Sequence, residues 1–86
     1  MSTSVVHVII QDLSRTVFEG DVMAVSSTSE YGPFDILSQH SNFISLIKEE
    51  IVLTHLDGSK QKIKLNTGVL RNVDDRVNIF IGVETL

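Results

Sequence analysis

Three histidines and a pair of adjacent aspartates are the residues whose types could do chemistry in this chain. His7, His40 and His55 lie far apart in the sequence, and none has a partner at the i,i+2 or i,i+4 spacing with which strands and helices hold a metal ion. His7 and His55 fall within strand-like segments, where we expect structural roles. Asp74 and Asp75 are neighbours, and such a pair more often closes a turn than acts as an acid and a base. We therefore expect no catalytic residue, no metal and no other cofactor.

His40 differs from the other two histidines because it stands among small polar residues, beside Gln39, Ser41 and Asn42. In such a loop a ring nitrogen can hold the backbone by bonding a carbonyl group. We expect this organising role, or a role in a contact surface. A small hydrolase that uses His40 with Asp35 or a serine is the least favoured alternative, because only proximity in the sequence supports it.

Composition narrows the classes of function. The 86 residues carry a net charge of −4 and include no cysteine, which excludes disulfides, thiolate metal sites and cysteine nucleophiles. Nucleic-acid binding needs clustered cations, and only Lys60, Lys62 and Lys64 come close, at alternating positions typical of one solvated strand face. No apolar run approaches the roughly 20 residues that span a bilayer, and the first residues lack a secretory pattern. We expect a cytoplasmic location, no nucleic-acid partner and no insertion into a membrane.

A single all-β domain must position these residues. From Val5 to Ile10 nearly all side chains are β-branched or aliphatic, as in a buried strand. Alternation from Val77 to Val83 predicts a last strand with one buried face. The pair Asp57-Gly58 between two alternating segments predicts a hairpin with a type I′ turn. With the other short segments, the pattern predicts about nine to ten short strands in a two-sheet sandwich or flattened barrel.

Several boundaries inside this domain are less regular. The domain is expected over residues 5–86, after a frayed segment at residues 1–4. Ser26 to Glu30 is predicted to be a loop or a weak strand, and Asn66 to Gly68 a turn. Phe43 to Ile47 fits either a strand or one helical turn, and we favour the strand.

The segment from Gly32 to Ile47 is unusually apolar for a connection in a small β-protein. Its large apolar residues either complete the core or meet a partner, and both readings stay open. The aromatic residues near its two ends favour an interface, because aromatic side chains supply much of the area at contact centres. The residues concerned are Pro33, Phe34, Phe43, Ile44 and Leu46.

In this segment the sequence resembles the ATP synthase epsilon chain, the small central-stalk subunit of the F1 sector. The N-terminal domain of that family carries G-x-x-G-I-L-P-G-H-A-P-L-L, where this chain reads G-P-F-D-I-L-S-Q-H-S-N-F-I. Ser38, Gln39 and Asn42 therefore replace a proline, a glycine and a second proline. The resemblance spans nearly the whole chain and continues through Phe18, Gly20, Val22, Val25, Gly58, Ile63, Leu65, Gly68, Val69, Leu70, Val77 and Ile79.

The resemblance implies a non-catalytic rotor subunit of an F-type ATP synthase, which couples the gamma subunit to the c-ring during ion-driven ATP synthesis. The complex would lie on the cytoplasmic face of the plasma membrane, and we expect the isolated chain to be monomeric. The family's C-terminal helical hairpin is expected to be absent, since the sequence stops at Leu86. The alternative, motivated by the altered P-G-H-A-P core, is a diverged β-sandwich that binds another protein outside ATP synthase.

By position in the family pattern, the resemblance also implies two contact surfaces. The c-ring would be faced by Tyr31, Gly32, Pro33, Phe34, His40, Ser41, Asn42 and Phe43. The gamma subunit would be faced by Asp12 and Ser45.

Overall fold

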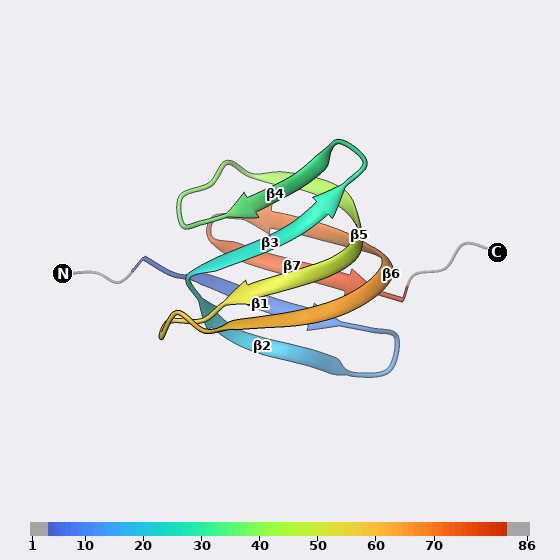
Figure 1. The fold of residues 1–86 in the computed structure, drawn as a ribbon, viewed down its shortest axis with the longest axis horizontal. Coiled ribbons are helices and arrows are strands. Elements are labelled where there is room, and N and C mark those ends of the chain that lie inside the picture. The colour runs from blue at the N-terminus through green and yellow to red at the C-terminus, as the bar shows by residue number, and fades with distance from the viewer. Residues whose placement is uncertain (1–3, 83–86) are drawn as a thin grey trace.

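Residues 4–82, the part of the chain that the computed structural model describes, form seven strands and no helix (Figure 1). The strands are β1 (Val6–Gln11), β2 (Thr16–Val22), β3 (Ala24–Ser29), β4 (Gly32–Ile36), β5 (Phe43–Thr54), β6 (Lys60–Val73) and β7 (Arg76–Ile81). The all-β prediction is confirmed. The predicted number of strands was too high, because β5 and β6 are long and each absorbs more than one of the expected short strands. The predicted frayed residues 1–3, and Val83 of the last predicted strand, lie outside the described residues.

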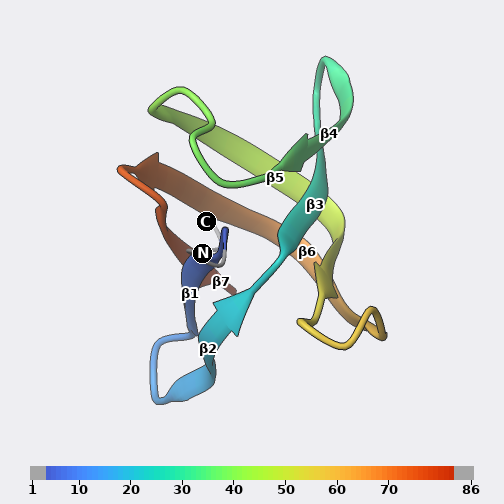
Figure 2. The same cartoon turned by 90° about the vertical axis from the view of Figure 1, so that its left-hand side faces the viewer.

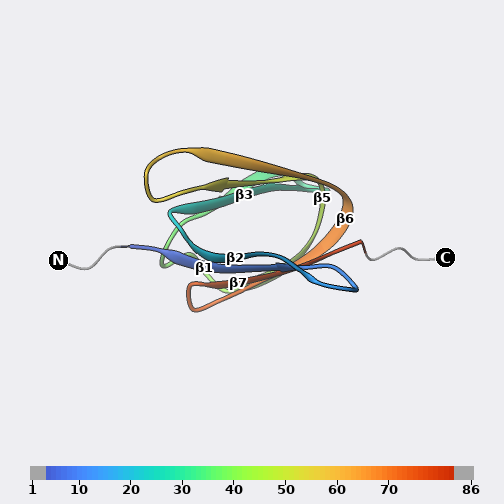
Figure 3. The same cartoon turned by 90° about the horizontal axis from the view of Figure 1, so that it is seen from below.

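All seven strands belong to one mixed sheet that folds over itself into two layers. The order is β2-β1-β7-β6-β5-β3-β4, and only the β1–β7 pair is parallel. Figure 3 shows β1, β2 and β7 in one layer and β3 in the other, and β5 and β6 pass between the layers (Figures 2 and 3). The sandwich is therefore made by two bent strands rather than by two separate sheets, and β2 and β4 form its free edges.

Local backbone features of β5 and β6 produce the bend. The register shifts between Lys48 and Glu49, and Glu49 has a φ of 75°, a conformation typical of a β-bulge. On β6, Gly68 lies where a Cβ atom would come within 2.9 Å of the carbonyl oxygen of Phe80, so only glycine fits without a shift. The predicted turn at Asn66 to Gly68 is therefore wrong: this segment is a bend inside one continuous strand.

A core of aliphatic side chains fills the space between the layers. Period-two alternation places one face of each strand inward, as the buried and half-buried residues of β1 illustrate. The prediction for the last strand is confirmed for Val77 and Ile79, which are fully buried. The whole core consists of Val6, Val8, Ile10, Val22, Val25, Ile36, Ile47, Ile51, Leu53, Leu70, Val77 and Ile79.

One hairpin turn differs in type from the sequence-based expectation, and another has the two positive φ values expected of the first. The hairpin around Asp57-Gly58 is confirmed, but only Gly58 has a positive φ, so the turn is not type I′. The turn with two positive φ values is formed by Asp74 and Asp75, at 51° and 63°, between the paired residues Val73 and Arg76. Aspartate tolerates this left-handed conformation better than most residues.

Candidate functional site

His40 does not form a catalytic constellation with its predicted partner. Its Nδ1 atom lies 2.8 Å from the carbonyl oxygen of Ser41, which confirms the expected contact between the ring and a backbone carbonyl group. The ring also packs on Phe43, with a centroid distance of 5.1 Å. Asp35 accepts a hydrogen bond from the hydroxyl group of Ser26 at 2.6 Å instead. Within residues 4–82 no hydrogen bond joins the His40 ring to Asp35 or to a serine hydroxyl group, so the geometry gives no support to the hydrolase alternative.

The other two histidines have side-chain partners; His7 lies on β1, whereas His55, predicted to be within a strand, directly follows the end of β5. The Nδ1 atom of His7 lies 2.8 Å from a carboxylate oxygen of Asp21, and its Nε2 atom lies 3.5 Å from Glu19. His55 bonds the side chain of Gln61 and packs edge-on against Phe18. These contacts agree with the structural roles predicted for both. Among the described residues, no group of three or more potential ligands could hold a metal ion.

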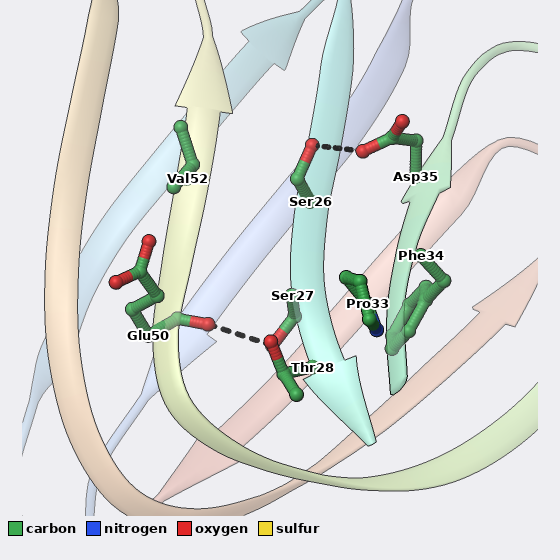
Figure 4. Close-up of a pocket in the computed structure, with 8 residues that line it drawn as sticks. All are labelled: Ser26, Ser27, Thr28, Pro33, Phe34, Asp35, Glu50 and Val52. Carbon is green, nitrogen blue, oxygen red and sulfur yellow. Dashed lines mark hydrogen bonds between the residues drawn. The ribbon is translucent and has the colours of Figure 1, made fainter. Parts of the chain in front are cut away.

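A shallow hollow of about 130 Å³ lies between β3, β4 and β5 (Figure 4). It is smaller than the several hundred Å³ of a typical ligand pocket. Two of its hydroxyl groups have partners within the wall, since Ser26 donates to Asp35 and Ser27 donates to the carbonyl oxygen of Glu50 at 2.7 Å (Figure 4). Because the hollow is small and these two hydroxyl groups are already bonded, we do not assign it a binding function.

The residues predicted to face a c-ring follow one free edge of the sheet. β4 is that edge strand, and the β3–β4 turn and the β4–β5 loop extend from its two ends (Figure 1). Tyr31 in the turn is 92% exposed, and Phe34 of β4 contacts Phe43 with ring centroids 5.7 Å apart. Gly32 and Ile36, at the ends of β4, are separated by about 13 Å at the rise of 3.3 Å per residue. The set thus forms a stripe rather than a compact patch, which we call the β4 edge.

A second surface consists of exposed apolar side chains on the outside of the layer that contains β7. Leu46, Val69 and Phe80 stand opposite one another on β5, β6 and β7, and Leu46 and Phe80 are 74% and 47% exposed. Ile44, two residues before Leu46, is 69% exposed. We call these four residues the apolar face. A hollow of about 180 Å³, lined by Leu46, Lys48 and four further residues, continues it toward the bend.

Of the two residues predicted to face gamma, Asp12 lies beside the apolar face, but Ser45 is on the other side of β5. Asp12 follows Gln11, which stands opposite Phe80 in the β1–β7 register. Ser45 alternates with Ile44 and Leu46 and pairs with the fully buried Leu70, so its side chain is on the side of β5 away from the apolar face. The row from Gln11 through Phe80 and Val69 to Leu46 crosses the four neighbouring strands β1, β7, β6 and β5. It spans about 14 Å at the usual strand spacing. The Asp12 carboxylate accepts the backbone N–H of Ser14 at 2.8 Å, the main cause that lowers the pKa of Asp12 below its ordinary value of 3.8.

The outer face of the other layer is polar. The three lysines of β6 are all exposed, which confirms the predicted solvated face. Lys62 lies 3.7 Å from the carboxylate of Glu50 on β5. Across residues 4–82 the two outer faces of the sandwich therefore differ, and only one of them presents an apolar row.

Comparison with known protein families decides the classification. A family model described as the β-sandwich domain of the ATP synthase delta/epsilon chain matches residues 5–83. The chain belongs to this family. The ATP synthase delta/epsilon fold is thus confirmed for nearly the whole chain, in agreement with the resemblance read from the segment around His40.

Curated relatives carry the name ATP synthase epsilon chain. One from a Nitratiruptor species is 38% identical over 53 residues, which is 60% of this chain and 41% of the relative. One from a strain of Helicobacter pylori is 32% identical over 64 residues, which is 74% of this chain and 52% of the relative. The matched part of the chain thus spans about half of these relatives or less.

Solved structures of large assemblies contain the same delta/epsilon fold. A chain from the Euglena gracilis mitochondrial ATP synthase, in a structure of OSCP, F1 and c-ring, matches with a TM-score of 0.86 and 13% identity, over 92% of this chain and 51% of the other. A chain from the Tetrahymena thermophila central stalk and c-ring matches with a TM-score of 0.71 and 6% identity, over 88% and 62%. At such identities the likeness is one of fold.

Along residues 4–82 the structure contains no helix able to span a bilayer.

Sequence reasoning missed the apolar face as a unit. Ile44 and Leu46 were noted as apolar, but Val69 and Phe80 were not connected with them. The available signal was that β5 is apolar at Phe43, Ile44, Leu46 and Ile47, hence on both of its faces, so one face had to be exposed or covered by a partner.

Proposed function

We propose that this chain is the rotor subunit of an F-type ATP synthase that couples gamma to the c-ring during ion-driven synthesis. The observation that carries the proposal is an exposed apolar row on one outer face of a domain of the delta/epsilon family. Isolated exposed apolar residues are common on soluble proteins, but a contiguous patch usually marks a contact site. The row of Leu46, Val69 and Phe80 is contiguous by register.

The apolar face is the proposed contact for gamma. Its centre combines aliphatic residues with one phenylalanine, a composition typical of the buried part of an interface. Burial of this surface would contribute about 25 cal/mol per Å² of apolar area removed from water. Asp12, at the margin beside β1, is proposed to belong to the polar rim, and a contact between Ser45 and gamma stays a prediction from the resemblance.

The β4 edge is the proposed contact for the c-ring. It offers an exposed tyrosine, a proline and several small polar groups, a mixture suited to the polar loops of a membrane-embedded ring. Pro33 lacks a backbone N–H, and Asp35 is charged, so this edge is poorly suited to pairing with another strand. Contact through side chains along the length of β4 is therefore favoured over extension of the sheet.

The proposed role is mechanical and non-catalytic. A subunit that transmits torque must resist shear, and a core packed at the density of an organic crystal deforms little. β5 and β6 support this role because each belongs to both layers. β5 also links the two proposed contact surfaces, because it carries Ile44 and Leu46 of the apolar face and Phe43, which contacts Phe34 of the β4 edge. The complex is proposed to hold the chain at the cytoplasmic face of the plasma membrane.

Co-purification with the cognate gamma subunit tests the proposal. The two proteins are expected to elute together in size-exclusion chromatography, ahead of either alone. Separate elution would contradict the proposed role. Recovery from native lysate of another protein, without any F1 subunit, would support the alternative of a diverged binding module.

A further inference from the structure

The β4–β5 loop is tied to the β6–β7 turn by hydrogen bonds that span more than 30 positions of sequence. The backbone N–H of Gln39 donates to a carboxylate oxygen of Asp75 at 2.6 Å. The backbone N–H of Asp74 donates to the side-chain oxygen of Asn42 at 2.9 Å. Both segments lie at the same end of the sandwich (Figure 1). Because residues 37–42 contain no proline, these bonds, rather than ring-restricted backbone, hold the loop.

Asn72 adds a bond from the interior. Its side chain is 1% exposed, and its Nδ2 atom donates to the carbonyl oxygens of Ser41 at 3.0 Å and of His40 at 3.5 Å. Its Oδ1 atom is buried and has no hydrogen-bond partner. An unpaired buried acceptor destabilises a fold. An aliphatic side chain of similar size would fill this core position and would bring no unpaired acceptor. Its burial at this position therefore indicates a role other than stability.

We propose that Asn72 and Asp75 are positioning residues that fix the backbone of residues 39–42 in the conformation that contacts the c-ring, an inference that rests on the proposed function. Gln39 requires such support, since its φ of 67° is left-handed and costs free energy for a residue other than glycine. A loop that is ordered before binding loses less conformational entropy on contact. The two residues act through the loop and do not themselves touch the ring.

Two variants separate this role from a contribution to folding. Asn72→Leu removes both the donor and the unpaired acceptor while it keeps the branching of the side chain. Asp75→Gly removes the carboxylate but keeps a residue that favours positive φ. Asp75→Asn is the matched control, because it keeps both an acceptor oxygen and tolerance of the left-handed conformation.

Amide hydrogen exchange and binding are then measured on the full chain. We expect exchange at Gln39 and His40 to be about tenfold faster in Asn72→Leu and Asp75→Gly, with core amides such as that of Ile79 unchanged, as for a local opening. The urea midpoint of Asn72→Leu should equal or exceed that of the wild type. Affinity for a purified complex of gamma with the c-ring should fall about fivefold or more in both variants, and Asp75→Asn should match the wild type.

The possible results distinguish the inference from the function on which it rests. A wild-type chain that does not bind the complex of gamma with the c-ring contradicts the proposed function, while hydrogen exchange still tests whether the loop is held. Wild-type binding with unchanged affinity in both variants contradicts the positioning role alone. Unchanged exchange at Gln39 and His40 in both variants contradicts it as well.

Discussion

The side-chain amide of Asn72 donates a hydrogen bond of 3.0 Å to the carbonyl oxygen of Ser41, across 31 positions of the sequence. The bond from Gln39 to Asp75 reinforces this connection, so the β4–β5 loop and the β6–β7 turn form one unit. At the other end of β4, the β3–β4 turn is held locally, by the bond from the Tyr31 N–H to the Ser29 hydroxyl oxygen. The two ends of the β4 edge therefore differ in how firmly the rest of the fold holds them.

A charge on the apolar face should weaken partner binding and leave the fold intact. We expect Leu46→Glu to change the free energy of unfolding by less than about 0.5 kcal/mol, because Leu46 is mostly exposed. Its affinity for gamma should fall at least about tenfold, equivalent to about 1.4 kcal/mol. Calorimetric titration measures the affinity. Leu56→Glu, at an exposed leucine of the β5–β6 turn, is the control and should bind normally; equal affinity of both variants would exclude the apolar face as the contact.

Substitution of Gly68 should destabilise the sandwich. A Cβ atom there would meet the carbonyl oxygen of Phe80 at 2.9 Å, which is backbone and yields little. We expect Gly68→Ala to cost about 1–3 kcal/mol, as overpacking typically does, in urea denaturation. Gly20→Ala is the control, because its Cβ would meet only the ring edge of Phe18 at 3.3 Å. A Gly68→Ala protein as stable as Gly20→Ala would refute the close approach of β6 and β7.

The left-handed turn residue Asp74 offers a test of backbone strain. Asp74→Ala and Asp74→Gly both remove the side chain, but only glycine adopts a φ of 51° without steric cost. We expect the alanine variant to be less stable by about 1 kcal/mol. Lys62→Ala and Lys62→Gly, in an extended part of β6, are the control. There the glycine variant should be the less stable one, by roughly 0.5–1 kcal/mol. The same order of stability at both positions would argue against a type I′ turn.

Acid should remove the contribution that the Asp12 carboxylate, in the β1–β2 turn, makes to the stability of the fold. The Asp12 carboxylate accepts hydrogen bonds from the backbone N–H of Ser14, the backbone N–H of Arg15 and the Ser14 hydroxyl group. These bonds, of which the first has the largest effect, lower the pKa of Asp12 below 3.8. A carboxyl group with a lowered folded pKa stabilises the fold above its unfolded pKa and loses that effect as pH falls through the folded pKa. The difference in free energy of unfolding between the wild type and Asp12→Asn should therefore be constant above about pH 5 and shrink below about pH 4. A difference that stays constant into strong acid would contradict the lowered pKa.

The parts of the fold that could be predicted are those encoded locally. Alternation along β1 and β7 indicates which side chains are buried, because the period of two is a property of each strand alone. The hairpin at Asp57-Gly58 could also be predicted, because its turn residues are next to each other in the sequence. Its turn type could not be predicted correctly. The conformation with two positive φ values instead lies at Asp74 and Asp75, which lack the glycine that usually marks a type I′ turn.

The long bent strands could not be predicted, because their bends depend on partners far away in the sequence. Asn66, Thr67 and Gly68 look like turn residues, yet β6 continues through them because β5 pairs with it on both sides of the bulge at Glu49. The residues of the β4 edge could be grouped from the sequence because they are close in it, but their arrangement as a stripe along an edge strand is seen only in the structure. The apolar face was not, since it joins β5, β6 and β7 through their register.

Site-specific photo-crosslinking in the assembled ATP synthase tests the central claim most directly. A photoreactive amino acid at Leu46, at Tyr31 or, as a control, at Lys64 on the polar outer face would be introduced into the chain before purification of the complex. We predict crosslinks from position 46 to gamma, from position 31 to subunit c, and none from position 64 to either. Crosslinks to gamma and subunit c from position 64 alone would contradict the assignment of both surfaces.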